Sequence, residues 1–157
     1  MKRVTYIGLF SALTYIFTAF VKVPLANQGY VHAGNVVIVV STFLLGPLYG
    51  GIIGAIGSFF ADLFVAPVWI PYTIIIKFLM AYFIGIGIKK RHFATVLFYI
   101  IGGVVFVGGY YFAEAVILGN WLVPFASTPA LFAEYAISLL IGLYAAKKLE
   151  KYHITLL

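Results

Sequence analysis

The sequence predicts an all-α, polytopic integral membrane protein: a bundle of six transmembrane helices with both termini in the cytoplasm. Composition is the first observation behind this prediction, because 64% of the 157 residues are hydrophobic and 9% are charged, whereas a soluble domain carries about 25% charged residues. The mean hydropathy is correspondingly high, at +1.13. The third observation is that the few cations stand in short clusters between apolar runs, and the length accommodates about six spans of roughly 20 residues with short loops.

The composition also excludes several classes of function. The chain contains no cysteine, which excludes disulfides and thiolate chemistry. The net charge of +6 comes from the clusters between spans, which is a topology signal rather than a nucleic-acid-binding stripe. No phosphate loop, dinucleotide fingerprint or metalloprotease motif is present. We therefore expect no cofactor, no metal site and no ATP hydrolysis by this chain.

We expect residues 1–157 to form one transmembrane domain. Its first span ends before Lys22 and Pro24 and lacks a convincing cleavage site, so we interpret it as a retained helix rather than a signal peptide. Within it, Gly8 and Ala12 form a small-xxx-small step suited to contact with another helix. The predicted spans are residues 4–21, 35–45, 47–65, 69–87, 93–118 and 129–147.

The interval between the first two spans, residues 23–34, is the most polar of the connections and is predicted to be a loop. The span after it, 35–45, covers only about half of a ~30 Å hydrocarbon core. Irregular backbone at membrane depth must face protein or water, so we expect a polar cavity above this short helix. The loop should gate that cavity through Asn27, Gln28, Gly29 and Tyr30.

The third span, 47–65, carries small residues in a line that ends in an acid. Residues four apart share one helix face, and small side chains there let a neighbouring backbone approach closely. Pro47 suits the first turn of this helix. We assign helix packing to the ridge formed by Gly50, Gly54, Ser58 and Asp62.

The last three spans contain most of the remaining charges. Lys77 lies in the middle of span 69–87, and Glu114 lies in span 93–118 on the same face as Tyr110 and Tyr111. Thr128 and Pro129 are typical of an N-cap and a first-turn proline. They precede the last span, in which Glu134 lies near the start.

The cations predict the orientation of the bundle. In a six-span arrangement most of them fall on one side, which the positive-inside rule places in the cytoplasm. The acids and the polar loop then gather toward the outer half, where Trp69 and Trp121 suit the membrane interface. The cations on the cytoplasmic side are Lys2, Arg3, Lys89, Lys90, Arg91, Lys147, Lys148 and Lys151.

Charges inside hydrocarbon cost roughly 2.5–3.5 kcal/mol each at a helix centre and usually pair or serve a function. One interpretation is a structural ion pair, Lys77 with Glu114 or with Asp62, that only fixes helix register. The other is a binding site for a flat, polar heterocycle, because aromatic side chains flank Glu114. The candidate binding residues are Glu114, Lys77, Tyr110, Tyr111, His32, Asn35, Asn120, Trp69 and Glu134.

Four motifs in order resemble one known family. They are GYVHAGN, then LLGPLYGGIIGAIGSFFADLF, then Pro71 followed by Lys77, then YYFAEAVILGN. This pattern is similar to the substrate-binding (S) components of energy-coupling factor (ECF) vitamin transporters, in the branch that groups riboflavin, hydroxymethylpyrimidine and vitamin B6 candidates. The resemblance covers essentially the whole chain. One departure is Gly34-Asn35, where the family often has Gly-Asp.

The resemblance implies six helices in the prokaryotic plasma membrane and a vitamin pocket in the outer half, closed by the loop between the first two spans. It also implies that small residues of the first span dock onto a transmembrane coupling subunit driven by two ATPases. The favoured ligands are pyridoxine, pyridoxamine and hydroxymethylpyrimidine, with riboflavin possible. Two alternatives stay open: an intramembrane enzyme that uses Lys77 and Glu114 as an acid–base pair, and a purely structural membrane subunit.

Overall fold

The computed structural model describes residues 2–24 and 30–151. Within these residues the chain forms six α-helices, which confirms the predicted helical bundle. The helices are α1 (Lys2–Phe20), α2 (Gly34–Leu45), α3 (Pro47–Val65), α4 (Ile70–Ile88), α5 (His92–Leu118) and α6 (Thr128–Lys151).

In the described part of the chain, five of these helices are long and apolar enough to cross a membrane. The exception is α2, with 12 residues. At 1.5 Å per residue it is about 18 Å long, so it crosses little more than half of the hydrocarbon core. The chain before α2 must therefore complete that crossing in another form.

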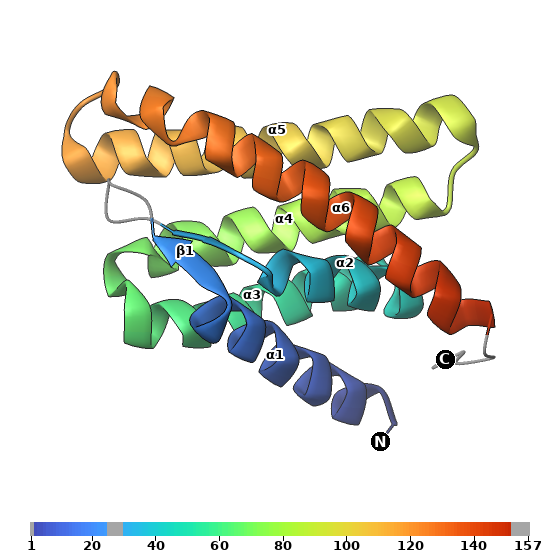
Figure 1. Ribbon diagram of the computed structural model, residues 1–157. Coiled ribbons are helices and arrows are strands. Elements are labelled where there is room, and N and C mark those ends of the chain that lie inside the picture. The colour runs from blue at the N-terminus through green and yellow to red at the C-terminus, as the bar shows by residue number, and fades with distance from the viewer. Residues whose placement is uncertain (1, 25–29, 152–157) are drawn as a thin grey trace.

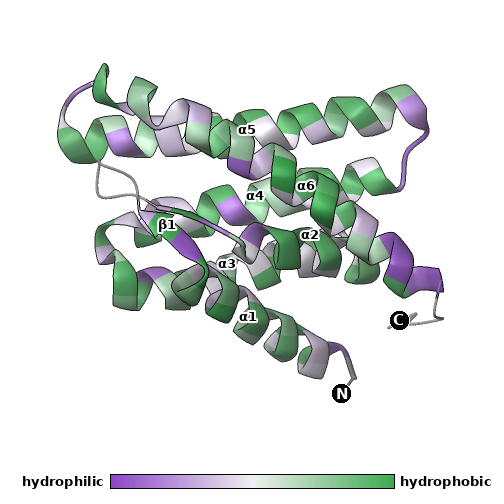
Figure 2. Ribbon diagram, in the orientation of Figure 1, coloured by the Kyte–Doolittle hydropathy of each residue, from purple (hydrophilic) through white to green (hydrophobic). Residues whose placement is uncertain are grey.

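Figure 1 shows the two ends of the described chain at one end of the bundle, together with the turn between α4 and α5. The connection from α5 to α6 lies at the opposite end, beside the chain that precedes α2. Hydrophilic segments lie at both ends of the bundle, including the α4–α5 turn and the end of α6, while the helices between are mostly hydrophobic (Figure 2). The cations of the α4–α5 turn and of the end of α6 share the side that holds the termini, as the positive-inside rule requires of a cytoplasmic face.

The predicted loop before α2 is partly a two-stranded antiparallel ribbon, which corrects our expectation. Strand β1 (Lys22–Pro24) pairs with β2 (Tyr30–His32), with Val23 opposite Val31. Pairing satisfies backbone groups that would otherwise lie unbonded near the hydrocarbon. Short 3-10 helices also replace parts of the predicted loops at η1 (Pro67–Trp69) and η2 (Val123–Ala126).

Thr128 differs from its predicted role as an N-cap. It is the first residue of α6, and its hydroxyl donates a hydrogen bond to the Pro124 carbonyl at 2.8 Å. The Ser127 hydroxyl oxygen lies 2.9 Å from the same carbonyl. The Thr128 hydroxyl therefore ties the start of α6 to η2 instead of capping a free N–H group.

Helix α3 approaches its neighbours closely along the glycine ridge. A methyl group at Gly50 would overlap Thr42 of α2, and one at Gly54 would press on the Lys77 carbonyl of α4. Such close approach is what small residues allow in membrane helices. Beside it, Ile38, Met80 and Phe106 belong to a buried apolar cluster that joins α2, α4 and α5.

Candidate ligand-binding site

A small, largely buried cavity lies near the end of the bundle opposite the termini. It is bounded by the β2 strand and by the outer ends of the surrounding helices. Its volume is about 40 Å³, counted as space open to the centre of a water molecule, which is room for roughly three waters. It is lined by Thr18, Tyr30, His32, Ser58, Asp62, Trp69, Thr73, Lys77, Phe106, Tyr110, Glu114, Ser127, Leu131 and Glu134.

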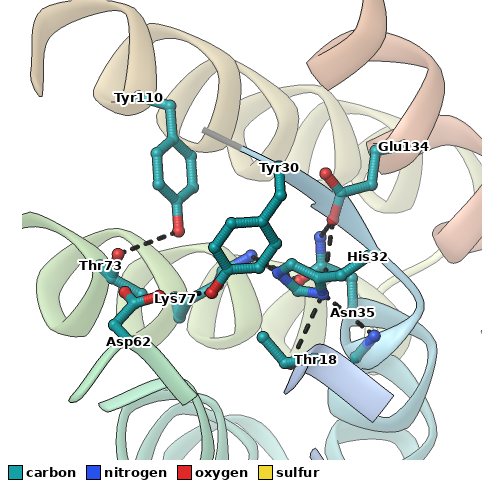
Figure 3. Close-up of polar contacts among 10 residues, drawn as sticks. Thr18, Tyr30, His32, Asn35, Asp62, Thr73, Lys77, Tyr110 and Glu134 are labelled. Atoms are coloured by element: carbon teal, nitrogen blue, oxygen red, sulfur yellow. Dashed lines mark hydrogen bonds and ion pairs between the residues drawn. The ribbon is translucent and has the colours of Figure 1, made fainter. Parts of the chain in front are cut away.

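Tyr30 of β2 extends into this cavity, where its hydroxyl donates a hydrogen bond to Asp62 Oδ1 at 2.5 Å (Figure 3). Burial raises the pKa of the Tyr30 phenol, and the Asp62 carboxylate raises it further. The phenol therefore keeps its proton and acts as a donor. Asp62 itself is 3% exposed, and its second oxygen, Oδ2, has no hydrogen-bond partner among the residues that the structure describes.

His32, two residues further along β2, anchors the strand from the same side, since alternate residues of a strand share a face. Its Nδ1 accepts a hydrogen bond from the Gly34 N–H at 3.1 Å, and its Nε2 lies 3.3 Å from Lys77 Nζ. Burial lowers the pKa of the His32 imidazole well below its usual value, and the charge of Lys77 acts in the same direction. The ring is therefore neutral.

Asn35, in the first turn of α2, connects a buried cation to a buried acid. Its Oδ1 accepts a hydrogen bond from Lys77 Nζ at 2.7 Å, and its Nδ2 donates one to Glu134 Oε1 at 2.7 Å. The amide group carries both an acceptor and a donor, so one side chain makes both bonds. The bridge joins α2, α4 and α6 beneath the cavity (Figure 3).

Helix α5 contributes an acid and aromatic rings to the opposite wall. Glu114 Oε2 accepts a hydrogen bond from the Ser127 hydroxyl at 2.6 Å. The Tyr110 hydroxyl donates to Thr73 Oγ1 at 3.3 Å, and its ring centroid lies 5.9 Å from that of Trp69. Lys77 Nζ lies 4.5 Å from the centre of the Phe106 ring, a favourable placement for a cation over an aromatic face. The cavity thus combines flat apolar walls with charged groups.

The structure brings together most of the candidate binding residues. Six line the cavity: His32, Trp69, Lys77, Tyr110, Glu114 and Glu134. Asn35 lies just outside the lining, within the bridge described above. Tyr111 and Asn120 lie elsewhere, because the Tyr111 hydroxyl donates to the Trp121 carbonyl and the Asn120 side chain accepts from the Leu122 N–H.

Two groups of predicted residues lie differently from our expectation. Ser58 and Asp62, which we assigned to helix packing, line the cavity. Of the predicted gating residues, Tyr30 lines the cavity as well, whereas Asn27, Gln28 and Gly29 lie outside the described residues.

The ion pairs that we considered for Lys77 do not form. Among the described residues, no carboxylate oxygen lies within 4 Å of Lys77 Nζ, so it pairs directly with neither Glu114 nor Asp62. The asparagine bridge takes the place of direct pairing. In the same part of the chain, no group of three or more His, Asp or Glu side chains is placed to hold a metal ion.

Several lining residues were missed from the sequence, although spacing offered a signal for most of them. Thr73 precedes Lys77 by one helical turn, and Phe106 precedes Tyr110 in the same way, so each shares a face with a residue that we had selected. Thr18 continues a row of hydroxyl side chains along α1 that begins at Ser11 and Thr14. Ser127 lies in a connecting segment and carried no comparable signal.

Comparisons with known proteins were made for the whole chain. A family model described as "ECF-type riboflavin transporter, S component" matches residues 1–151. A protein of Pyrococcus woesei described as "Uncharacterized protein in gap 3'region" is 34% identical over 107 residues, which are 66% of this chain and 72% of that protein. A solved structure described as "Structure and mechanism of the S component of a bacterial ECF transporter" superposes with a TM-score of 0.73 at 18% identity, covering 98% of each chain. At that identity the structural match supports the fold alone.

Proposed function

The chain belongs to the ECF-type riboflavin transporter S-component family, and on this basis we propose that it captures a one-ring vitamin or vitamin precursor in the cavity beneath the β1–β2 ribbon. As a member of this family it is a substrate-binding transport subunit of the prokaryotic plasma membrane. It is not an enzyme. The acid–base alternative for Lys77 and Glu114 is therefore wrong.

The observation that carries the proposal is the combination of aromatic walls and buried polar groups in one enclosed space. Trp69, Phe106 and Tyr110 offer ring faces, while Glu114 and Asp62 offer acceptors for hydroxyl or amine groups. Charge-assisted hydrogen bonds of this kind contribute about 1.5–3 kcal/mol each. A flat ring with several polar substituents suits such a lining.

The size of the cavity favours a single ring. At about 40 Å³ the cavity holds only a few waters, so any vitamin must displace part of the lining. Tyr30 is the side chain best placed to move, because it belongs to the short β2 strand rather than to a long helix. A one-ring ligand requires less displacement than the three fused rings and ribityl chain of riboflavin.

A second feature supports docking onto a partner subunit. An apolar groove of about 380 Å³ runs between α1 and α3, with Gly8 and Ala12 on one side and Phe60 and Phe64 on the other. A methyl group at Gly8 would meet nothing within 4 Å, so this glycine is not needed for packing inside the bundle. We propose that the groove receives a helix of the transmembrane coupling subunit of an ECF module, whose two ATPases supply the energy.

The ligand proposal is tested by native mass spectrometry of the purified protein incubated with equal concentrations of pyridoxine, hydroxymethylpyrimidine, riboflavin and biotin. We expect a one-ring adduct at stoichiometric occupancy and no biotin adduct, since the biotin carboxylate would face buried acids. A riboflavin adduct alone would contradict the one-ring proposal and leave the transport role intact. Failure of all vitamins to bind would favour a structural subunit.

A further inference from the structure

The charges that line the cavity are unbalanced. Among the described lining residues there are three carboxylates, Asp62, Glu114 and Glu134, and one lysine, Lys77. All are buried, with exposed fractions of 3%, 1%, 8% and 1% respectively. Buried acids require compensation by a counter-charge or by hydrogen bonds. The surplus of acids therefore indicates that the cavity suits a ligand with a positive charge.

The surplus is concentrated at Asp62. Lys77 and Glu134 are connected by the Asn35 amide, which forms a 2.7 Å hydrogen bond with each of them. Glu114 accepts the Ser127 hydroxyl at 2.6 Å. Asp62 receives the Tyr30 hydroxyl on Oδ1 and the Thr73 side chain also stabilises its carboxylate, but its Oδ2 has no hydrogen-bond partner among the described residues, although the side chain is 97% buried. A buried carboxylate oxygen without a partner is rare and marks a position for a missing donor.

The neighbours of Asp62 suit a cationic ring in particular. Tyr110 and Phe106 form an edge-to-face pair, with centroids 5.1 Å apart, and Tyr110 also packs beside Trp69. Aromatic faces attract cations, and Lys77 Nζ already lies 4.5 Å from the Phe106 ring centre and 5.2 Å from the Tyr110 ring centre. The aromatic ring of Tyr30 carries a hydroxyl that donates to Asp62. A ligand with a flat ring and an amine donor would reproduce this arrangement.

We infer that the cavity selects a single heterocyclic ring that bears a protonated amine, and that Asp62 binds this amine in place of the Tyr30 hydroxyl. This inference rests on the proposed function and assigns the ligand a charge. The amine would donate to Oδ2, and the Tyr30 ring would leave the cavity as the ligand ring enters. A neutral ligand would leave Asp62 Oδ2 without a charged donor. Asp62 is then the residue that discriminates an amine from an alcohol.

Pyridoxamine and pyridoxine provide a matched pair, because they differ in one position, aminomethyl against hydroxymethyl. We expect isothermal titration of the purified wild-type protein to show pyridoxamine binding more tightly by about one to two orders of magnitude, the range of a charge-assisted hydrogen bond. Asp62→Asn should abolish most of this preference by weakening pyridoxamine binding. Glu114→Gln is the matched control, and it should weaken both ligands in parallel and retain their ratio.

A second variant keeps the inference testable if Asp62→Asn does not fold. Tyr30→Phe removes the competing donor without changing Asp62, so pyridoxamine affinity should rise several-fold. A fall in affinity would mean that the Tyr30 hydroxyl contacts the ligand, which would overturn the inference. Equal wild-type affinities for the pair, or binding of neither, would also overturn it. Tight riboflavin binding that Asp62→Asn leaves unchanged would overturn this inference while preserving the role as an S component.

Discussion

At the scale of single residues, Asn35 explains how the chain tolerates a buried lysine without an ion pair. The amide accepts from Lys77 and donates to Glu134 at 2.7 Å each, so cation and acid are coupled through a neutral group. An ionised aspartate at this position could accept from Lys77 but could not donate to Glu134. The amide is therefore what allows both bonds to form.

Asn35→Asp should destabilise the protein. The change removes the donor to Glu134 and places a second carboxylate against it, at a position that is 1% exposed. Loss of a buried hydrogen bond to a charged group costs about 1–3 kcal/mol, so we expect a lower melting temperature in detergent. Combining it with Glu134→Gln, which supplies an amide donor toward the new acid, should restore most of the loss. An unchanged melting temperature in the single variant would show that the bridge does not contribute to stability.

Glu114→Gln tests the predicted ligand contact on α5. The substitution keeps the shape and removes the charge, so vitamin affinity should fall by about one to two orders of magnitude. Because no carboxylate lies within 4 Å of Lys77 Nζ among the described residues, the change strands no paired cation there, and thermal stability should change little. A clear loss of stability with normal affinity in the folded fraction would instead assign Glu114 a structural role.

At the scale of elements, the β2 strand borders the cavity through Tyr30 and His32. The β1–β2 ribbon brings Tyr30 and His32 over the site, while α2 is too short to cross the membrane core. The short α2 helix and the ribbon therefore cross the membrane core together. Of these two elements, the ribbon can move without disturbing a helix.

Ligand should restrict the motion of this ribbon. The chain has no cysteine, so Val31→Cys provides a unique site for a spin label on the face of β2 opposite Tyr30 and His32. We expect electron paramagnetic resonance to show slower label motion at saturating vitamin, because the closed ribbon packs on its ligand. The control is Val96→Cys, on a part of α5 that is 55% exposed and distant in the chain. Equal spectra with and without ligand at position 31 would exclude a gating role.

The sequence was sufficient to predict the helical bundle, but not the contacts that its helices make with one another. Long apolar runs between cation clusters predicted the helical membrane bundle, and the short α2 and the polar segment before it pointed to a cavity. The ribbon was missed, because pairs of three residues are too brief to show the alternation that identifies a strand. The partners of Lys77 were missed for a different reason: hydrogen bonds between α2, α4 and α6 depend on tertiary geometry. For the same reason Asp62 fitted a packing ridge and turned out to line the cavity.

At the scale of the whole molecule, the cavity that we propose as the ligand site and the groove that we propose as the docking site lie in different parts of the bundle. The cavity lies between the helices near the outer end, whereas the α1–α3 groove faces the membrane. Its apolar lining makes it suited to a helix rather than to a polar ligand. Helix association in lipid depends on this type of close fit.

Gly8→Leu combined with Ala12→Leu should fill the groove and block docking. Both residues are exposed, and added atoms at Gly8 meet nothing within the chain, so the isolated protein should fold and bind its vitamin normally. Uptake into vesicles that also contain the coupling subunit and ATPases should be abolished. The matched control is Gly108→Leu on α5, where a methyl group likewise meets nothing within 4 Å, and it should leave uptake intact. Loss of vitamin binding in the double variant would point instead to packing inside the bundle.

The position of His32 on the ribbon has a consequence for the speed of vitamin entry. His32 is held by Gly34 at 3.1 Å and lies 3.3 Å from Lys77, so a ribbon that swings while these contacts persist pivots there. Tyr30 is two residues from that pivot, a lever of about 7 Å. Displacement of the Tyr30 ring alone would open a passage about one aromatic ring wide. Molecules of that width would then pass without disturbing the His32 contacts, and larger ones would first have to break them. Association rates should therefore fall steeply with ligand width, a dependence that stopped-flow fluorescence of Trp69 would measure.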